Sequence, residues 1–340
     1  MMDLNAIWFL LVGVLITGYA VLDGFDLGVG VLHLFTRSET ERRIHINAIG
    51  PVWDGNEVWL LTGGGALFAA FPMVYATIFS SFYLALMLVL TALIFRAVAM
   101  EFRGKLDSPG WRRLWDWSFG LGSLLPAILF GVAVGNILRG IPIDKDKVFT
   151  GSFIGLLNPY AILIGLLSFV LFTMHGAIYM SLKTDGALRE RMRKWVFGTW
   201  MAFVILYLIS TLATFFVARY LFESALERPV TWILFLLLPA AVLYIPVATK
   251  GEKYVRAFLA SSATIVSIIG LAAAGMFPRL VPSITDLNYS LTIYNASSTP
   301  RTLTVMLIVA LLGMPIVIAY TAYIYRVFKG KVVLGEESYH

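Results

Sequence analysis

Charged residues are rare along this chain, and the apolar stretches between them mark candidate membrane-spanning helices. Residues 4–22 carry no charge, and the apolar stretch continues to about Leu34. An α-helix rises about 1.5 Å per residue and a bilayer's hydrocarbon core is about 30 Å thick, so about 20 apolar residues make one crossing. The pattern therefore predicts an all-α membrane protein with several such helices.

Two of the charge-free stretches are too long for one crossing. Residues 58–95 carry no charge over 38 positions, which would be roughly 57 Å of helix. We place the break at Phe71-Pro72, because proline disfavours helical geometry in the residue before it. In the stretch 148–182, Asn158-Pro159 is expected to start the helix. The chain then has nine predicted spans: 6–34, 52–71, 73–99, 117–138, 159–182, 195–218, 229–249, 257–278 and 302–325.

The distribution of Lys and Arg between the loops supports nine spans. With nine, one side of the membrane holds 18 of these residues and the other holds 7, with Arg96 inside a span end. Merging 52–99 into one span gives a poorer separation, 15 against 10. Cytoplasmic loops carry the excess of positive charge. We therefore predict an N-terminus outside and a C-terminus in the cytoplasm.

Composition agrees with a single integral membrane domain over residues 1–340. The chain is 59% hydrophobic and 14% charged, whereas soluble domains carry about 25% charged residues. It has no Cys, which excludes disulfides, thiolate metal sites and Fe–S clusters. We attribute the net charge of +6 to cytoplasmic loops and expect no nucleic-acid partner.

A few ionisable residues fall inside or at the ends of the first three predicted spans. They share the predicted inner half of the membrane: Asp23, Asp26, Asp54, Glu57, Arg96 and Glu101. An unpaired carboxylate at that depth costs about 2.5–3.5 kcal/mol, so it binds a proton or finds a partner. Arg96 is the obvious partner, because it stays charged.

Two interpretations of this cluster stay open from spacing alone. Carboxylates graded from the cytoplasmic surface toward the midplane are what a proton path needs. Buried Asp–Arg pairs also lock helices together without conducting anything, and Asp54 and Glu57 lie where acids stabilise a helix N-terminus.

The histidines carry little chemistry. His33 lies at the end of the first predicted span, and His175 alone lies well inside one, where it is either an axial haem ligand or, as we predict, a hydrogen-bonded structural residue. We expect no metal site and no catalytic residue in this chain.

Several segments resemble subunit II of cytochrome bd-type quinol oxidases. The longest are LDGFDLGVG at 22–30 and GPVWDGNEVWL at 50–60. Shorter ones follow in order: Phe95-Arg96 with 101–103, 115–117 with Gly135-Asn136, and Asn158-Pro159. The resemblance runs through nearly the whole chain.

The resemblance implies a multi-pass protein of the bacterial plasma (inner) membrane, with two four-helix bundles and a peripheral helix. The family enzyme oxidises quinol and reduces O2 to water, and it is electrogenic without pumping protons. Haems b558, b595 and d belong to the partner, subunit I, so this chain would ligate none. The resemblance leaves room for a small single-span subunit and for a structural quinone, which some members hold.

The resemblance also implies a role for the acidic cluster. In family members these motifs line a proton path toward the oxygen site. Carried over, its residues are Asp23, Asp26, Trp53, Asp54 and Arg96. We add their neighbours Glu57 and Glu101.

Two other classes of function compete with this interpretation. One is a proton- or cation-coupled secondary transporter, whose sites favour the bilayer midplane and broken helices of paired repeats. The gathering of charges in one membrane half and one third of the chain speaks against it. The other is a non-conducting membrane scaffold. A haem-bearing partner that co-purifies with the chain would favour the oxidase.

Overall fold

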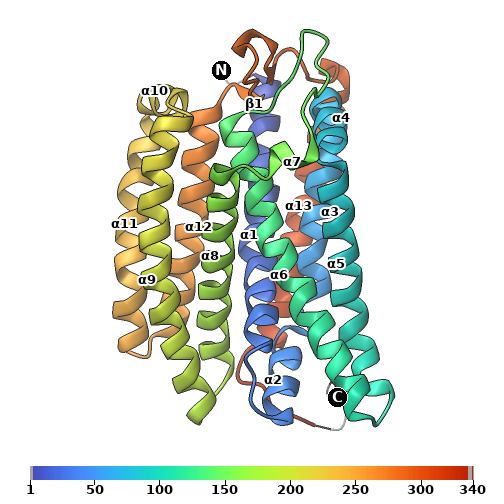
Figure 1. Ribbon diagram of the computed structural model, residues 1–340, viewed down its shortest axis with the longest axis vertical. Coiled ribbons are helices and arrows are strands. Elements are labelled where there is room, and N and C mark those ends of the chain that lie inside the picture. Colours follow the sequence, from blue (N-terminus) through green and yellow to red (C-terminus); the bar gives the residue numbers. More distant parts are fainter. Residues whose placement is uncertain (1–2, 336–338, 340) are drawn as a thin grey trace.

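Long helices running along the longest axis make up the computed structural model of the chain (Figure 1), which describes residues 3–335 and 339. Within those residues, eight helices are long and apolar enough to cross a membrane. They are α1 (Leu4–His33), α5 (Tyr83–Phe102), α6 (Pro109–Arg139), α8 (Pro159–Lys183), α9 (Gly186–Val217), α11 (Pro229–Lys250), α12 (Tyr254–Met276) and α13 (Pro300–Val327).

Shorter elements complete the chain. They are α2 (Glu39–Ile49), α3 (Trp53–Ala70), α4 (Pro72–Ser81), η1 (Arg103–Lys105), α7 (Phe153–Leu156), α10 (Tyr220–Leu226), β1 (Arg279–Val281), η2 (Leu287–Tyr289) and β2 (Leu291–Thr292). The strands β1 and β2 pair antiparallel between the predicted spans 257–278 and 302–325.

The long helices form two packed groups and one outlier. Helices α8, α9, α11 and α12 pack on one another, and α1, α3, α5 and α6 form a second group. Contacts of α8 with α1 and α6 join the groups, while α13 packs against α1 and α3. Figure 1 shows α9, α11 and α12 on one side and α3 and α5 on the other. The all-α multi-pass fold is confirmed, and the grouping agrees with two four-helix bundles and a peripheral helix.

The contact between the two groups depends on glycine. A Cβ on Gly28 of α1 would lie 1.9 Å from the backbone oxygen of Phe172 on α8. A Cβ on Gly176 of α8 would lie 2.5 Å from the backbone carbon of Gly28. Neither site has room for a side chain, so α1 and α8 approach backbone to backbone.

The region of predicted spans two and three differs in part from expectation. The predicted break is present, since α3 ends at Ala70 and α4 begins at Pro72. The predicted span 73–99, however, is interrupted between Ser81 and Tyr83. The hydroxyl of Ser81 donates to the Thr77 carbonyl at 2.5 Å, a back-bond that bends helices. Because α3 has polar first turns, it is not among the eight apolar helices, and nine crossings stay a prediction.

The first and last long helices run parallel. Near their starts, the indole of Trp8 donates to the Leu303 carbonyl at 3.0 Å. Near their ends, the rings of Phe25 and Tyr325 lie 6.5 Å apart between centroids. Both helices therefore end at the same end of the molecule, which we call the α2 end because α2 follows α1 there. By the charge distribution, the α2 end is the predicted cytoplasmic side.

A buried histidine on α2 predicts acid sensitivity. The His45 side chain is completely buried, and this burial, with His33 nearby, lowers its pKa to about 3. Below about pH 6.5 the unfolded chain binds a proton at His45 that the folded chain excludes, so stability falls as the pH decreases toward 3. At pH 5 the loss is about 2 kcal/mol.

We expect the protease resistance of this chain, in the purified complex, to fall more steeply from pH 7.5 to 5 in the wild type than in His45→Gln. The comparison of slopes removes any constant destabilisation by the substitution. If protease resistance fell equally steeply with pH in the wild type and in His45→Gln, the acid sensitivity would not come from His45.

Candidate functional site

Three helices bring the predicted acids to one buried arginine. Arg96 of α5 binds Asp23 of α1 through both guanidinium nitrogens, with Nη2–Oδ1 at 2.8 Å and Nη1–Oδ2 at 3.2 Å. Its Nη1 also lies 2.9 Å from Oε1 of Glu57 on α3. Arg96 and Asp23 are fully buried, whereas the Glu57 side chain is 22% exposed. The predicted pairing is present, and it adds Glu57 as a direct ligand of the guanidinium.

Asp26 lies one turn further along α1 and has a separate set of contacts. It is completely buried. The amide of Asn56 donates to its Oδ2 at 2.7 Å, and the hydroxyl of Tyr325 donates to Asn56 Oδ1 at 3.0 Å. Within the described part of the chain, Asp26 Oδ1 has no hydrogen-bond partner. Asp26 is therefore a buried carboxyl group whose second oxygen accepts no hydrogen bond from the described residues.

The remaining predicted residues lie at the rim of this cluster. Asp54 is exposed and sits in the first turn of α3, next to the half-buried Trp53. Glu101 is exposed near the end of α5. Exposure thus falls from Asp54 through Glu57 to Asp23, a gradient that leads from the α2 end into the bundle.

The C-terminal segment reaches the same rim. The phenol of Tyr339 donates to Oε1 of Glu101 at 3.2 Å, and its backbone N–H donates to Asn47 Oδ1 at 2.9 Å. Burial, with Glu101 nearby, raises the pKa of the Tyr339 phenol. The sequence around Tyr339 carries no signal that predicted this contact.

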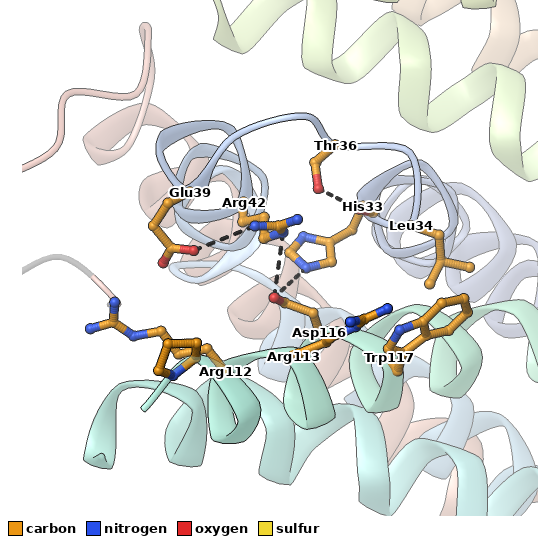
Figure 2. A pocket seen from close by; sticks show the side chains of 10 residues that line it. His33, Leu34, Thr36, Glu39, Arg42, Arg112, Arg113, Asp116 and Trp117 are labelled. Atoms are coloured by element: carbon orange, nitrogen blue, oxygen red, sulfur yellow. Dashed lines mark hydrogen bonds and ion pairs between the residues drawn. The ribbon is translucent and has the colours of Figure 1, made fainter. Parts of the chain in front are cut away.

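A second polar cluster at the α2 end was missed (Figure 2). His33 Nε2 lies 2.8 Å from Oδ1 of Asp116 on α6. The buried Arg103 donates from Nε to the same oxygen at 2.7 Å and from Nη2 to Glu39 Oε2 at 2.8 Å. Arg42 Nε lies 3.4 Å from Asp116 Oδ2. The only signal in the sequence was Asp116 between two tryptophans, which spacing alone could not connect to α1 or α2.

His175 is fully engaged in hydrogen bonds. Its Nδ1 lies 2.7 Å from Ser261 Oγ and its Nε2 lies 3.0 Å from the Val21 carbonyl oxygen. Its ring stacks on Phe258 with centroids 4.7 Å apart. Both nitrogens are occupied, as predicted for a structural histidine. Among the described residues, no group of three or more His, Cys, Asp or Glu is arranged to hold a metal ion.

Comparison with known proteins shows similarity over the whole chain. The sequence profile of the family "Cytochrome bd terminal oxidase subunit II" matches residues 4–328. The chain is 41% identical to cytochrome bd-I ubiquinol oxidase subunit 2 of Escherichia coli K12, covering 97% of this chain and 95% of that protein. It is 38% identical to cytochrome bd ubiquinol oxidase subunit 2 of Bacillus subtilis, covering 98% of each.

A solved structure has the same fold. One chain of the bd oxidase from Geobacillus thermodenitrificans superposes with a TM-score of 0.79, covering 96% of this chain and 99% of that chain. At 16% sequence identity this likeness concerns the fold alone.

Proposed function

The chain belongs to the cytochrome bd terminal oxidase subunit II family, and on this premise we propose that it conducts cytoplasmic protons toward the oxygen site of a haem-bearing partner. It is a multi-pass subunit of a bacterial membrane oxidase. The complex would oxidise quinol and reduce O2, with the haems held by subunit I and none by this chain. Protons drawn from the cytoplasm would make turnover electrogenic without pumping.

The observation that carries the proposal is the graded set of carboxylates at the α2 end. Asp54 is exposed, Glu57 is partly buried on Arg96, and Asp23 and Asp26 are completely buried. The guanidinium of Arg96 stabilises the carboxylates of Asp23 and Glu57 within the bundle, and the Asp26 oxygen that lacks a hydrogen-bond partner offers a buried protonation site. The acids come from helices α1 and α3, so the path would run along their contact.

A structural role is proposed alongside conduction. The Arg96 ion pairs join α1, α3 and α5, so they would also hold the face of the bundle that supports subunit I. The transporter alternative is not favoured, because the acids gather toward one end of the bundle and not at midplane breaks in paired helices.

The test uses the outermost acid. We expect Asp54→Asn to lower quinol-dependent oxygen consumption per haem while the haem content of the purified complex stays unchanged. An exposed carboxylate raises the local proton concentration, an effect that reaches about tenfold at low ionic strength and weakens with salt. The deficit should therefore shrink as salt is added.

Glu190→Gln serves as the matched control, since Glu190 is an exposed acid on α9, 51% exposed and paired with Arg193. It should leave the rate unchanged. Full turnover by Asp54→Asn at low salt, with normal haem, would remove Asp54 from the path.

A further inference from the structure

A cavity at the α2 end lies outside the proposed proton path. It has a volume of about 530 Å³ and lies between the end of α1, the start of α2 and the first turns of α6 (Figure 2). His33, Arg42, Arg112, Arg113 and Asp116 line it. The cavity is large enough for a small polar group and opens at the surface of the chain.

The acids that line this cavity are already neutralised from within the protein. Asp116 accepts from the buried Arg103 and contacts His33 and Arg42, and Glu39 accepts from Arg103 as well. These carboxylates therefore do not balance the other basic residues of the cavity.

Two arginines remain as surplus positive charge. The only ion pair of Arg112 among the described residues is with Asp107, which is 94% exposed, and exposed pairs contribute little. The side chain of Arg113 makes no hydrogen bond or ion pair with any residue that the structure describes. Both lie in the first turns of α6, where the helix dipole is positive and favours an anion. An anion with several oxygen atoms would supply acceptors for both arginines.

The cavity continues into an apolar surface of α6. Leu34 and Trp117 line it. Along the same face of α6, at spacings of three and four residues, exposed apolar side chains follow into the span: Leu114 (56% exposed), Trp117 (50%), Leu121 (43%) and Leu125 (43%). A basic cavity at one end of an exposed apolar stripe suits a ligand with an anionic head and a hydrocarbon tail.

We propose that this cavity binds the phosphate-bearing headgroup of one anionic phospholipid, with Arg112 and Arg113 on the phosphate and an acyl chain along Trp117, Leu121 and Leu125. Guanidinium groups match phosphate oxygens in geometry and stay charged. The lipid would join α1, α2 and α6 at the membrane surface. This proposal does not depend on proton conduction.

The test measures lipid binding to the delipidated complex by native mass spectrometry. Phosphatidylglycerol, phosphatidylcholine and inorganic phosphate are the probes. We expect the wild-type complex to retain one phosphatidylglycerol more than the double variant Arg112→Gln/Arg113→Gln, whose affinity for that lipid should fall roughly tenfold or more. Arg113→Gln alone breaks no bond of the described residues and should give a partial loss.

The matched control is Arg193→Gln/Lys194→Gln, two adjacent basic residues at the same end on α9, which should bind as the wild type does. Equal phosphatidylglycerol binding by the wild type and the Arg112/Arg113 variant would overturn the proposal. If the wild type bound phosphatidylcholine as tightly as phosphatidylglycerol, the proposed preference for an anionic headgroup would be wrong. Displacement of the lipid by excess inorganic phosphate would identify the ligand as a free anion and would contradict the proposal that the cavity binds a phospholipid.

Discussion

Replacing Arg96 by leucine is expected to reduce the amount of assembled complex in the membrane to roughly a tenth or less, because loss of one partner of a buried ion pair costs about 3–5 kcal/mol. The substitution leaves Asp23 completely buried and without its guanidinium, and it frees Glu57 as well. Native domains are stable by only about 5–15 kcal/mol. Haem absorbance and immunodetection of this chain in isolated membranes measure the outcome.

Two companion variants separate the ion pair from simple loss of volume. Arg96→Lys keeps the charge but not the two-nitrogen contact with Asp23, so it should restore part of the yield. In Arg96→Leu/Asp23→Leu the stranded acid is removed, and buried pairs replaced by apolar residues are often tolerated. The double variant should therefore accumulate better than Arg96→Leu. Wild-type yield from Arg96→Leu itself would contradict the pairing.

Local rules were enough to predict several features of the fold. Pro72 ended one helix at Ala70 because a residue before proline avoids helical geometry. Asn158 started α8, and its side chain accepts from the Ala161 N–H at 3.0 Å, as an N-cap residue does. The spacing of Asp23 and Asp26 and the depth of Arg96 were sufficient to predict an intramembrane ion pair, because lone charges there are too costly.

Local rules could not predict contacts between segments that lie far apart in the sequence. Tyr325 bonds Asn56 across 269 positions, and Tyr339 bonds Glu101 across 238. Nothing near Asn56 in the sequence distinguishes a partner of Asp26 from an ordinary polar residue of a helix first turn. The same holds for His33 and Asp116, whose contact depends on how α1 and α6 cross.

Asp26→Asn is expected to keep the complex assembled and to lower oxygen consumption per haem roughly tenfold or more, because removal of a positioned proton-transfer group typically costs about 10²–10⁴ in rate. The amide has nearly the size of the carboxyl group and can still accept from Asn56, which donates to Asp26 Oδ2 at 2.7 Å. It cannot take up and release a proton. Haem content and quinol-dependent oxygen uptake of the purified complex provide the two readouts.

Two further variants, Asp26→Glu and Tyr325→Phe, decide whether the loss of oxygen-consumption rate comes from the missing titratable group or from disturbed packing. Asp26→Glu keeps a titratable group and should recover part of the rate, although its extra methylene strains a buried site. Tyr325→Phe removes the hydroxyl that bonds Asn56 but no titratable carboxyl group, so it should disturb packing at least as much and slow turnover much less. If Asp26→Asn turned over at the wild-type rate, protons would not pass through this carboxyl group. If Tyr325→Phe were as slow as Asp26→Asn, the hydrogen-bonded packing around Asn56 would account for the defect, and conduction would have to follow Glu57 and Asp23 alone.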